Sequence, residues 1–369
     1  MKYYIIAGEA SGDLHASNLM KELKEMDAQA EFRGLGGDRM KGEGAALIKH
    51  IRELAFMGFT EVIMNLRTIL RNIAECKDDI EKWKPDVVIL VDYPGFNLRI
   101  AKHAHEIGLK VFYYISPQVW AWKKGRVKQI RQHVDEMYCI LPFEKDFYRQ
   151  WSYKVNYVGH PLLDVIGDDH LPSIPDEISR IDKKIIAVLP GSRKQEITRM
   201  LPVMLEAGER LGPDYHMVVA KAPAQPDELY EEFVSGSENV TLVRDQTYPL
   251  LSVAWSAMVT SGTATLEAGL FRVPQVVCYK GGNVSYQIAR RLVNIDFISL
   301  VNLIMEKEVV KELIQQEMNA ESLTAEIKKL NDPTVRARLE LDYLALRDRL
   351  GGPGASARTA DHMWEALNE

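Results

Sequence analysis

Short apolar runs alternate with helical patterns along both halves of this chain, and this alternation constrains the fold more than any other feature. Strands that alternate with helices form βαβ units and parallel sheets, so the pattern predicts an α/β fold with two Rossmann-like parallel-sheet domains. The expected strands are short and rich in β-branched or aromatic residues: Tyr3–Ala7, Asp86–Val91, Lys110–Ile115, Glu136–Leu141, Lys184–Leu189, Tyr215–Ala220, Val240–Val243, Ala257–Thr260 and Pro274–Tyr279.

The length of 369 residues also favours two domains. The polar stretch Gly167–Pro175 contains two prolines and is interpreted as a linker, which gives an N-terminal domain over residues 1–165 and a second domain over residues 166–330. From Tyr286 onward the pattern is mostly helical. The helices of residues 331–369 are expected to cross back onto the first domain or onto a partner subunit of a homodimer. Two such domains form a cleft, and ligands bind beyond the carboxyl ends of the strands.

Composition excludes several classes of protein. No stretch approaches the roughly 18 unbroken apolar residues of a membrane span, and the start is interpreted as a strand that leads into a loop rather than a signal peptide. The three cysteines are far apart, which predicts no disulfide framework, no metal site and a reducing cytoplasm. The net charge of −6 argues against binding of nucleic acid over the whole surface, and no nucleic-acid partner is expected, although this charge leaves a local basic patch open.

Two loops in the second half carry the features of a nucleotide site. The strand that ends at Leu189 leads into Gly191, Ser192 and Arg193, and a helix is expected from about Glu196. Glycine allows close approach of the backbone, a helix N-terminus attracts a diphosphate, and arginine adds a forked contact. A plain strand–helix turn with a surface arginine is the alternative.

The second loop, Ser261–Glu267, again joins a strand to a helix through small residues. Ser261 or Thr263 is expected to cap this helix, with Gly262 between them. Glu267 lies about one turn into the helix, where a carboxylate can accept both hydroxyls of a ribose. A glutamate that only complements the helix dipole is the alternative. The two loops together favour nucleotide binding over either alternative.

The first half places acidic loops after its strands. Gly8, Glu9, Ser11, Gly12 and Asp13 follow the first strand, and their carboxylates would repel a diphosphate, so this loop is expected to face an acceptor or a sugar. A further glycine-rich turn is expected at Gly34–Asp38.

Asp92 ends the strand Asp86–Val91, at the edge where ligands of parallel sheets bind, and a rigid turn follows it. This position suits a general base that removes a proton from an attacking hydroxyl. An aspartate that only caps the next helix is the alternative.

An aromatic and basic stretch follows Ser116-Pro117-Gln118. It contains Trp120 and Trp122 and then five cations within nine residues, which are Lys123, Lys124, Arg126, Lys128 and Arg131. The stretch favours contact with anionic lipid headgroups or a phosphate, and a solvated basic helix face is the alternative. The apolar run with Phe56 and Met57 is either core or a surface that receives an acyl chain or touches a bilayer.

These motifs together resemble the lipid-A-disaccharide synthase family of bacterial glycosyltransferases. The matching segments are spread in order from residue 3 to about residue 314: Gly8–Asp13, Met57-Gly58, Pro85-Asp86, Asp92–Asn97, Ser116–Trp122, Leu141–Lys145, Val158–Pro161, Leu189–Arg193, Ser261–Glu267 and Ser299–Asn302. Two positions depart from the family pattern. Gly95 stands where many relatives carry a second acid, and Val301 replaces the usual proline of the last motif.

The resemblance implies a GT-B fold and an inverting transfer that needs neither metal nor cofactor. It implies the donor UDP-2,3-diacylglucosamine, the acceptor 2,3-diacylglucosamine 1-phosphate, and a β-1,6 disaccharide 1-phosphate and UDP as products. Asp92 corresponds to the catalytic base, Arg193 to the arginine at the donor diphosphate, and Glu267 to the ribose carboxylate. Asn302 is added to the donor site. Gly8, Ser11, Gly12, Asp13 and Gln118 are assigned to the acceptor side.

Acylated substrates in a bilayer further imply a cytoplasmic enzyme that docks peripherally on the inner membrane. An enzyme like UDP-N-acetylglucosamine 2-epimerase and a catalytically silent nucleotide-binding peripheral membrane protein are the alternatives.

Overall fold

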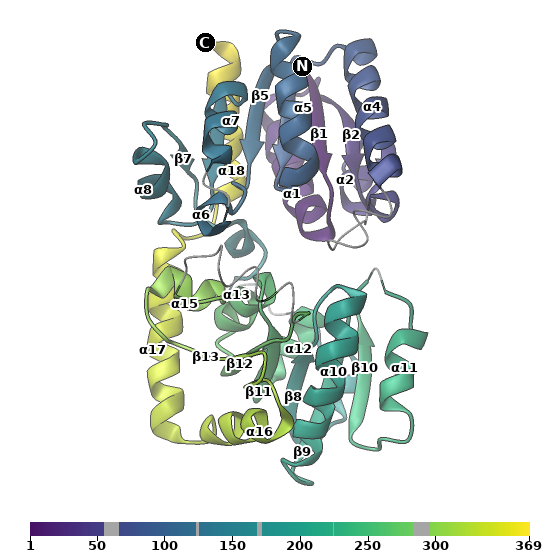
Figure 1. Ribbon diagram of the computed structural model, residues 1–369, viewed down its shortest axis with the longest axis vertical. Helices are drawn as coiled ribbons and strands as arrows, with labels where there is room; N and C mark the ends of the chain where they lie inside the picture. Colours follow the sequence, from purple (N-terminus) through teal and green to yellow (C-terminus); the bar gives the residue numbers. More distant parts are fainter. Residues whose placement is uncertain (55–65, 123–124, 168–171, 224, 283–285, 287–295) are drawn as a thin grey trace. The chain divides into compact units, whose positions relative to one another are not determined.

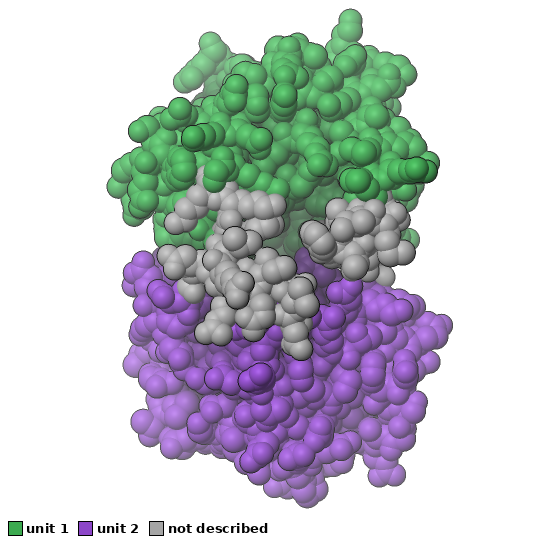
Figure 2. Space-filling model, in the orientation of Figure 1, with its two compact units in different colours: residues 1–165, 350–369 green, residues 166–349 purple. Residues whose placement is uncertain are grey.

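The computed structural model describes residues 1–54, 66–122, 125–167, 172–223, 225–282, 286 and 296–369. By their contacts these residues divide into two compact units, which Figure 2 colours separately. Unit 1 comprises Met1–Val165 together with Leu350–Glu369, and unit 2 comprises Ile166–Arg349. The predicted linker therefore lies at the beginning of unit 2.

The described part of unit 1 contains a parallel sheet of seven strands in the order β3-β2-β1-β4-β5-β6-β7 (Figure 1). The central strands β1 and β4 are almost entirely buried and almost entirely apolar, as expected for a parallel sheet that is covered on both faces. The strands are β1 (Lys2–Ala7), β2 (Glu31–Gly36), β3 (Ala46–His50), β4 (Val87–Val91), β5 (Lys110–Tyr114), β6 (Glu136–Cys139) and β7 (Asn156–Tyr157).

Helices cover both faces of this sheet. Helices α4, α5 and α7 pack on one face, and α1 packs against α18 on the other (Figure 1). The described helices of unit 1 are α1 (Ala10–Met26), α2 (Asp38–Gly42), η1 (Ile51–Glu53), α4 (Leu66–Trp83), α5 (Pro94–Glu106), α6 (Val119–Trp122), α7 (Arg126–His133), α8 (Glu144–Arg149), η2 (Pro161–Asp164) and α18 (Ala355–Asn368).

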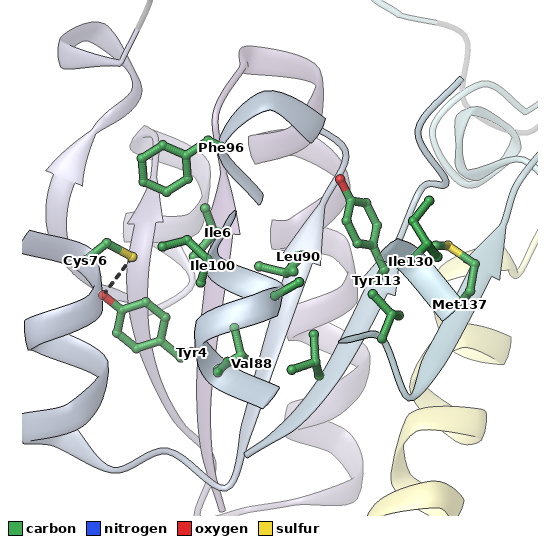
Figure 3. Close-up of a cluster of buried hydrophobic side chains, with 14 of the residues drawn as sticks. Tyr4, Ile6, Cys76, Val88, Leu90, Phe96, Ile100, Tyr113, Ile130 and Met137 are labelled. Carbon is green, nitrogen blue, oxygen red and sulfur yellow. Dashed lines mark hydrogen bonds between the residues drawn. The ribbon is translucent and has the colours of Figure 1, made fainter. Parts of the chain in front are cut away.

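The core of unit 1 lies between the sheet and helices α4, α5 and α7, and Figure 3 shows part of it. Tyr4, Val88 and Leu90 point from the strands toward Cys76 and Ile100 on the helices. The Tyr4 hydroxyl is satisfied within this apolar layer, because it donates to Asp79 (3.0 Å) and accepts from the Cys76 thiol (3.8 Å). Like Cys76, the other two cysteines are free and buried.

The predicted glycine-rich turn at Gly34–Asp38 is wrong, because Gly34–Gly36 belongs to strand β2. Glycine is needed there for close packing rather than for a turn. A Cβ on Gly34 would lie 2.0 Å from the carbonyl oxygen of Ile5 on the neighbouring strand, and one on Gly36 would lie 2.3 Å from the sulfur of Met40. The glycines therefore mark a strand whose backbone is approached closely.

Unit 2 repeats the same plan. Its described strands form a parallel sheet in the order β10-β9-β8-β11-β12-β13, which is the order of a dinucleotide-binding fold. All nine strands expected from the sequence are present in the two sheets, with ends within two residues. The strands of unit 2 are β8 (Lys184–Leu189), β9 (Tyr215–Lys221), β10 (Val240–Arg244), β11 (Ser256–Thr260), β12 (Gln275–Tyr279) and β13 (Lys311–Ile314).

Helices α10 and α16 pack together on one face of this sheet, and α12, α13 and α17 lie on the other. The expectation of mostly helices after Tyr286 missed β13, a four-residue edge strand that begins with two charged residues. The described helices are α9 (Asp176–Ser179), α10 (Lys194–Glu209), α11 (Glu228–Val234), α12 (Thr247–Val253), α13 (Thr263–Leu270), α15 (Leu300–Met305), α16 (Ala320–Lys329) and α17 (Pro333–Arg349).

The last helix, α18, belongs to unit 1 although the preceding helix belongs to unit 2. The Asp164 carboxylate accepts hydrogen bonds from the backbone amides of Gly354 (2.7 Å), Ala355 (3.0 Å) and Ser356 (2.8 Å). These are the first amides of α18, which have no partners within the helix, so Asp164 fixes its start. Among the described residues, no helix is both long and apolar enough to cross a membrane.

Candidate functional site

The order of strands in unit 1 brings two of the predicted loops together. Strand β1 pairs with β4, and Ala7 lies opposite Val91 at their carboxyl ends. Because β2 and β3 lie on one side of β1 and β5 to β7 lie beyond β4, the strand order reverses direction between these two strands. Ligands of parallel α/β sheets bind at such a reversal. Gly8 and Asp92 both lie there.

Asp92 and Tyr93 have unusual backbone conformations, with φ angles of 44° and 47°. Two consecutive non-glycine residues in the left-handed region are strained, and such strain persists only when the surroundings hold it. The carbonyl oxygen of Asp92 accepts hydrogen bonds from the side-chain amide of Asn97 (2.7 Å) and from the hydroxyl of Tyr113 (2.5 Å). These two buried side chains therefore hold the turn that presents the Asp92 carboxyl.

The Asp92 carboxyl lies in a desolvated position. Burial, and in second place the negative charge of Glu9, raise its pKa from 3.8 to about 7. A carboxyl with this pKa exchanges its proton near neutral pH. Helix α5 is not capped by the Asp92 side chain, because its N-cap residue is Tyr93 and no side chain caps it.

The loop after β1 packs tightly beneath this turn. A Cβ on Gly8 would lie 2.4 Å from the ring of Tyr93, so only glycine fits under the ring. Helix α1 begins at Ala10, earlier than the predicted loop allowed, and its Gly12 is buried while Ser11 is exposed. The Asp13 carboxylate is buried and accepts from the backbone amides of Gly37 (2.6 Å), Arg39 (3.1 Å) and Met40 (3.1 Å).

Both carboxylate oxygens of Asp13 are thus engaged in holding the start of α2, and these bonds point to a structural contribution. The acceptor-facing roles predicted for this loop stay predictions. Gln118, also assigned to the acceptor side, is exposed between β5 and α6.

The aromatic and basic stretch is only partly described. Lys123, Lys124, Phe56 and Met57 lie outside the described residues. Lys128 and Arg131 are exposed on α7. Arg126 is partly buried, and burial lowers its pKa.

A buried polar cluster contains residues of two segments that carry the family resemblance, Ser116–Trp122 and Leu141–Lys145. Glu144, from the Leu141–Lys145 motif, is fully buried and accepts from the backbone amide of Leu141 (3.0 Å). Burial raises its pKa to about 7. The buried Ser116 hydroxyl lies 2.9 Å from the hydroxyl of Tyr148 on the same helix as Glu144. Sequence reasoning assigned no role to this cluster.

In unit 2, the two predicted nucleotide loops follow neighbouring strands. Strand β8 pairs with β11, with Leu189 opposite Val259, and the strand order again reverses between them. After β8, Gly191 has a φ of 107°, and Arg193 is the N-cap residue of α10. The Arg193 guanidinium is half exposed and donates to the carboxylate of Glu196 (2.9 Å). The carbonyl oxygen of Ser192 accepts from Gln225 (3.0 Å).

The loop after β11 leads into α13 through Gly262, which has a φ of 155° and lies exposed. The predicted caps are wrong. Gly262 is the N-cap residue, Thr263 is already the first helical residue, and the Ser261 hydroxyl donates to the carbonyl oxygen of Ile298 (2.7 Å) instead. Among the described residues, no side-chain hydrogen bond caps the start of α13.

Glu267 lies in the second turn of α13 and is partly buried. Burial raises its pKa to about 7, and a hydrogen bond from the hydroxyl of Tyr248 (3.3 Å) acts in the opposite direction.

Asn302 is fully buried. Its side-chain amide donates to Val310 (2.8 Å) and Glu312 (2.9 Å), and its oxygen accepts from Val309 (2.8 Å) and Val310 (3.0 Å). These bonds leave Asn302 no polar group for a ligand, and its donor role stays a prediction.

Sequence reasoning missed Tyr113, Asn97 and Glu196 as parts of these sites. In the sequence, Asn97 ends the motif Asp92–Asn97, and its residue type alone indicates no role. Tyr113 is one of two adjacent tyrosines in the buried strand Lys110–Tyr114, and the sequence does not distinguish it from an ordinary core residue. Glu196 stands three residues after Arg193, which is the spacing of a capping box, and this spacing could have indicated its contact with the N-cap residue. Among the described residues, no group of three or more His, Cys, Asp or Glu side chains is arranged to hold a metal ion.

Comparison with solved structures agrees with this architecture. The UDP-GlcNAc 2-epimerase from Neisseria meningitidis bound to UDP-GlcNAc superposes with a TM-score of 0.70 at 14% identity, over 99% of this chain and 100% of that one. The calicheamicin glycosyltransferase superposes with a TM-score of 0.60 at 16% identity, over 99% and 97%. At such identities the likeness shows the fold alone, and it confirms the predicted GT-B fold with two parallel-sheet domains.

Sequence comparison is more specific. The family model described as lipid-A-disaccharide synthetase matches residues 3–360. A lipid-A-disaccharide synthase of Syntrophus aciditrophicus is 42% identical over 367 residues, covering 96% of this chain and 95% of the relative. One from Myxococcus xanthus is 39% identical over 370 residues, covering 98% and 97%. The chain therefore belongs to the lipid-A-disaccharide synthase family, and it is a glycosyltransferase of lipid A biosynthesis.

Proposed function

We propose that this chain transfers the sugar of UDP-2,3-diacylglucosamine to the 6-hydroxyl of 2,3-diacylglucosamine 1-phosphate with inversion, and that Asp92 is the general base. The bond from the acceptor oxygen to C1 of the donor forms while the bond from C1 to the diphosphate oxygen breaks. The hydroxyl proton passes to the Asp92 carboxylate, and UDP leaves with the bonding electron pair. The products are the β-1,6 disaccharide 1-phosphate and UDP.

One observation carries this proposal: Asp92 lies on a strained turn at the strand reversal of unit 1, where burial raises the pKa of its carboxyl to about 7. A sugar hydroxyl is a poor nucleophile, and a base whose pKa lies near the working pH combines sufficient ionisation with sufficient proton affinity. Tyr113 and Asn97 hold the turn in place through hydrogen bonds to the carbonyl oxygen of Asp92. The fixed backbone limits the orientations of the Asp92 carboxylate.

The groups of unit 2 are proposed to bind the donor. The amides of Ser192 and Arg193 and the Arg193 guanidinium take the diphosphate, aided by the N-termini of α10 and α13. These groups also stabilise the negative charge that UDP gains as it leaves. Glu267 accepts the two ribose hydroxyls. Hydrogen bonds from those hydroxyls favour its ionised form, so donor binding near neutral pH releases a proton from this carboxyl.

The test incubates the protein with both acylated substrates and detects the products by mass spectrometry. We expect the disaccharide from the unchanged chain and a loss on the order of 10²- to 10⁴-fold in Asp92→Asn, with UDP affinity retained. Asp86→Asn is the control. It changes an exposed carboxyl that directly precedes the first residue of strand β4, and it is expected to keep activity. Free N-acetylmannosamine from UDP-N-acetylglucosamine would indicate an epimerase instead, and UDP binding without turnover would indicate a silent nucleotide-binding protein.

The acylated substrates also require access to a lipid surface. We propose that the chain docks peripherally on the cytoplasmic face of the inner membrane through Lys123, Lys124, Lys128 and Arg131. Each cation near an anionic surface contributes about 1 kcal/mol. Lys128 and Arg131 are exposed on α7, which supports this choice. Arg126 is left out of the test because it is partly buried.

Sedimentation with vesicles of anionic and of neutral lipid tests this docking. Charge reversal of Lys123, Lys124 and Lys128 to glutamate is expected to abolish the preference for anionic vesicles. A triple reversal at three exposed lysines elsewhere in unit 1, Lys41, Lys82 and Lys102, serves as the control for net charge. Equal loss of binding in both variants would show that overall charge, and not this stretch, governs the interaction.

A further inference from the structure

The candidate diphosphate site in unit 2 contains an anion of the chain itself. Glu196 lies in the first turn of α10, and one carboxylate oxygen accepts from the backbone amides of Ser192 (3.2 Å) and Arg193 (3.3 Å). Its other oxygen accepts from the Arg193 guanidinium (2.9 Å). These three donors are the ones that a diphosphate would use.

The loop is shaped around this carboxylate. Gly191 adopts a φ of 107°, and a Cβ at this position would lie only 2.5 Å from a carboxylate oxygen of Glu196. A side chain there would displace the carboxylate. The Glu196 side chain is 26% exposed, compared with 50% for Arg193, so the acid is the more enclosed partner of the pair. The absence of a side chain at Gly191 is what allows the acid to reach the amides.

We propose that Glu196 is a resident anion of the donor site, which the diphosphate of UDP must displace. This inference rests on the proposed function, because it takes the loop after β8 as the diphosphate site. Two anions cannot accept from the same three donors at once, and a carboxylate left beside the diphosphate repels it. Glu196 therefore lowers the affinity for UDP, and it returns to the donors as UDP departs.

The contact with the N-cap amide also belongs to a capping box, which stabilises the start of α10. Glutamine serves in a capping box as well as glutamate does, because it keeps the accepting oxygen and loses only the charge. Glu196→Gln therefore separates the two contributions. If capping alone explains the contact, the substitution leaves UDP affinity unchanged.

The proposed displacement favours turnover. An enzyme gains nothing from holding its product tightly, and product release limits the rate of many enzymes. As the diphosphate leaves, the Glu196 carboxylate takes its place on the same amides and guanidinium. These donors therefore keep a hydrogen-bond acceptor throughout product release. The carboxylate thus lowers the barrier to product release.

The experiment measures dissociation constants of UDP and uridine by calorimetry at constant ionic strength. We expect Glu196→Gln to bind UDP about two- to fivefold more tightly, the range for one partly exposed charge, with uridine affinity unchanged. Glu206→Gln, on the same helix and also paired with an arginine, removes the same charge away from the site and is expected to change neither constant. Unchanged or weaker UDP binding by Glu196→Gln, or equal tightening for uridine, would overturn the inference.

Failure of the inference and failure of the proposed function give different results. If UDP does not bind at the loop after β8, the Arg193→Ala variant should bind UDP with the same affinity as the unchanged chain. If the donor site is right but Glu196 does not compete, Arg193→Ala weakens UDP binding while Glu196→Gln has no effect. A thermal unfolding curve of each variant shows whether α10 keeps its stability.

Discussion

Replacing Asp92 by asparagine should remove activity and at the same time stabilise the protein at alkaline pH. The native carboxyl has a pKa of about 7 because burial, and then the charge of Glu9, disfavour its ionised form. The unfolded chain releases this proton near pH 3.8, whereas the native chain keeps it until about pH 7. Between these values the unfolded state binds fewer protons, so native stability falls as pH rises.

The magnitude follows from the two pKa values. A pKa raised from 3.8 to about 7 corresponds to a loss of stability on the order of 4 kcal/mol above pH 7. About half of that loss has accumulated at pH 5.5. Asparagine keeps the shape of the side chain and carries no charge, so it abolishes this pH dependence. Asparagine, like aspartate, tolerates a φ of 44°, so the substitution adds no backbone strain.

Differential scanning calorimetry at pH 5.5 and pH 8 tests the prediction, and it separates the transitions if the two units unfold in turn. The advantage of Asp92→Asn over the unchanged chain should grow by about 2 kcal/mol between these pH values, or about 4–8 °C in melting temperature. Asp78→Asn, which removes an exposed carboxylate paired with Lys82 on α4, is the control and should show no such growth. An advantage that is constant or shrinks with pH would refute the assignment of a raised pKa to Asp92.

Two further perturbations test the same corner of unit 1. Glu9→Gln removes the second cause of the raised Asp92 pKa and leaves burial, so the acid limb of the pH–rate profile should move to lower pH, while Glu25→Gln at an exposed position of α1 leaves it in place. Gly8→Ala should destabilise the protein by about 1–3 kcal/mol in urea unfolding, because the new methyl group would lie 2.4 Å from the Tyr93 ring. Gly95→Ala, which meets no atom within 4 Å, should not destabilise it, and equal losses in both glycine variants would count against the packing argument.

Sequence patterns predicted most of the inner strands and the edge strand β10, but they missed the edge strands β3, β7 and β13. Central strands such as Val87–Val91 are buried on both faces and therefore consist of apolar β-branched residues, which makes them easy to recognise. The edge strands β3 (Ala46–His50) and β13 (Lys311–Ile314) are partly exposed and contain charged residues. Strand β2 was missed because its two glycines resemble a turn, although they serve close packing against Ile5 and Met40.

The loops of the site were found by the same reasoning, but their internal contacts were not. Strand–glycine–helix junctions are visible in a sequence because each depends on local chemistry. The hydrogen bond from Tyr113 to the carbonyl oxygen of Asp92 joins residues 21 positions apart, and no local pattern indicates it. The predicted cap of α13 was wrong for a related reason, because the Ser261 hydroxyl donates to the carbonyl oxygen of Ile298, which is 37 positions away.

The two site carboxyls with the same raised pKa complicate any pH–rate measurement, and their different neighbours show how to separate them. Asp92 lies beside the negative charge of Glu9, whereas Glu267 accepts from Tyr248 and is proposed to accept from ribose hydroxyls as well. The profile of kcat/KM reports groups of the free enzyme and therefore contains both carboxyls. If Glu267 binds the ribose as proposed, saturating donor is expected to stabilise its ionised form and to lower its pKa out of the neutral range. The profile of kcat at saturating donor then reports Asp92 alone, and the acid-limb shift expected for Glu9→Gln should be sharper in kcat than in kcat/KM.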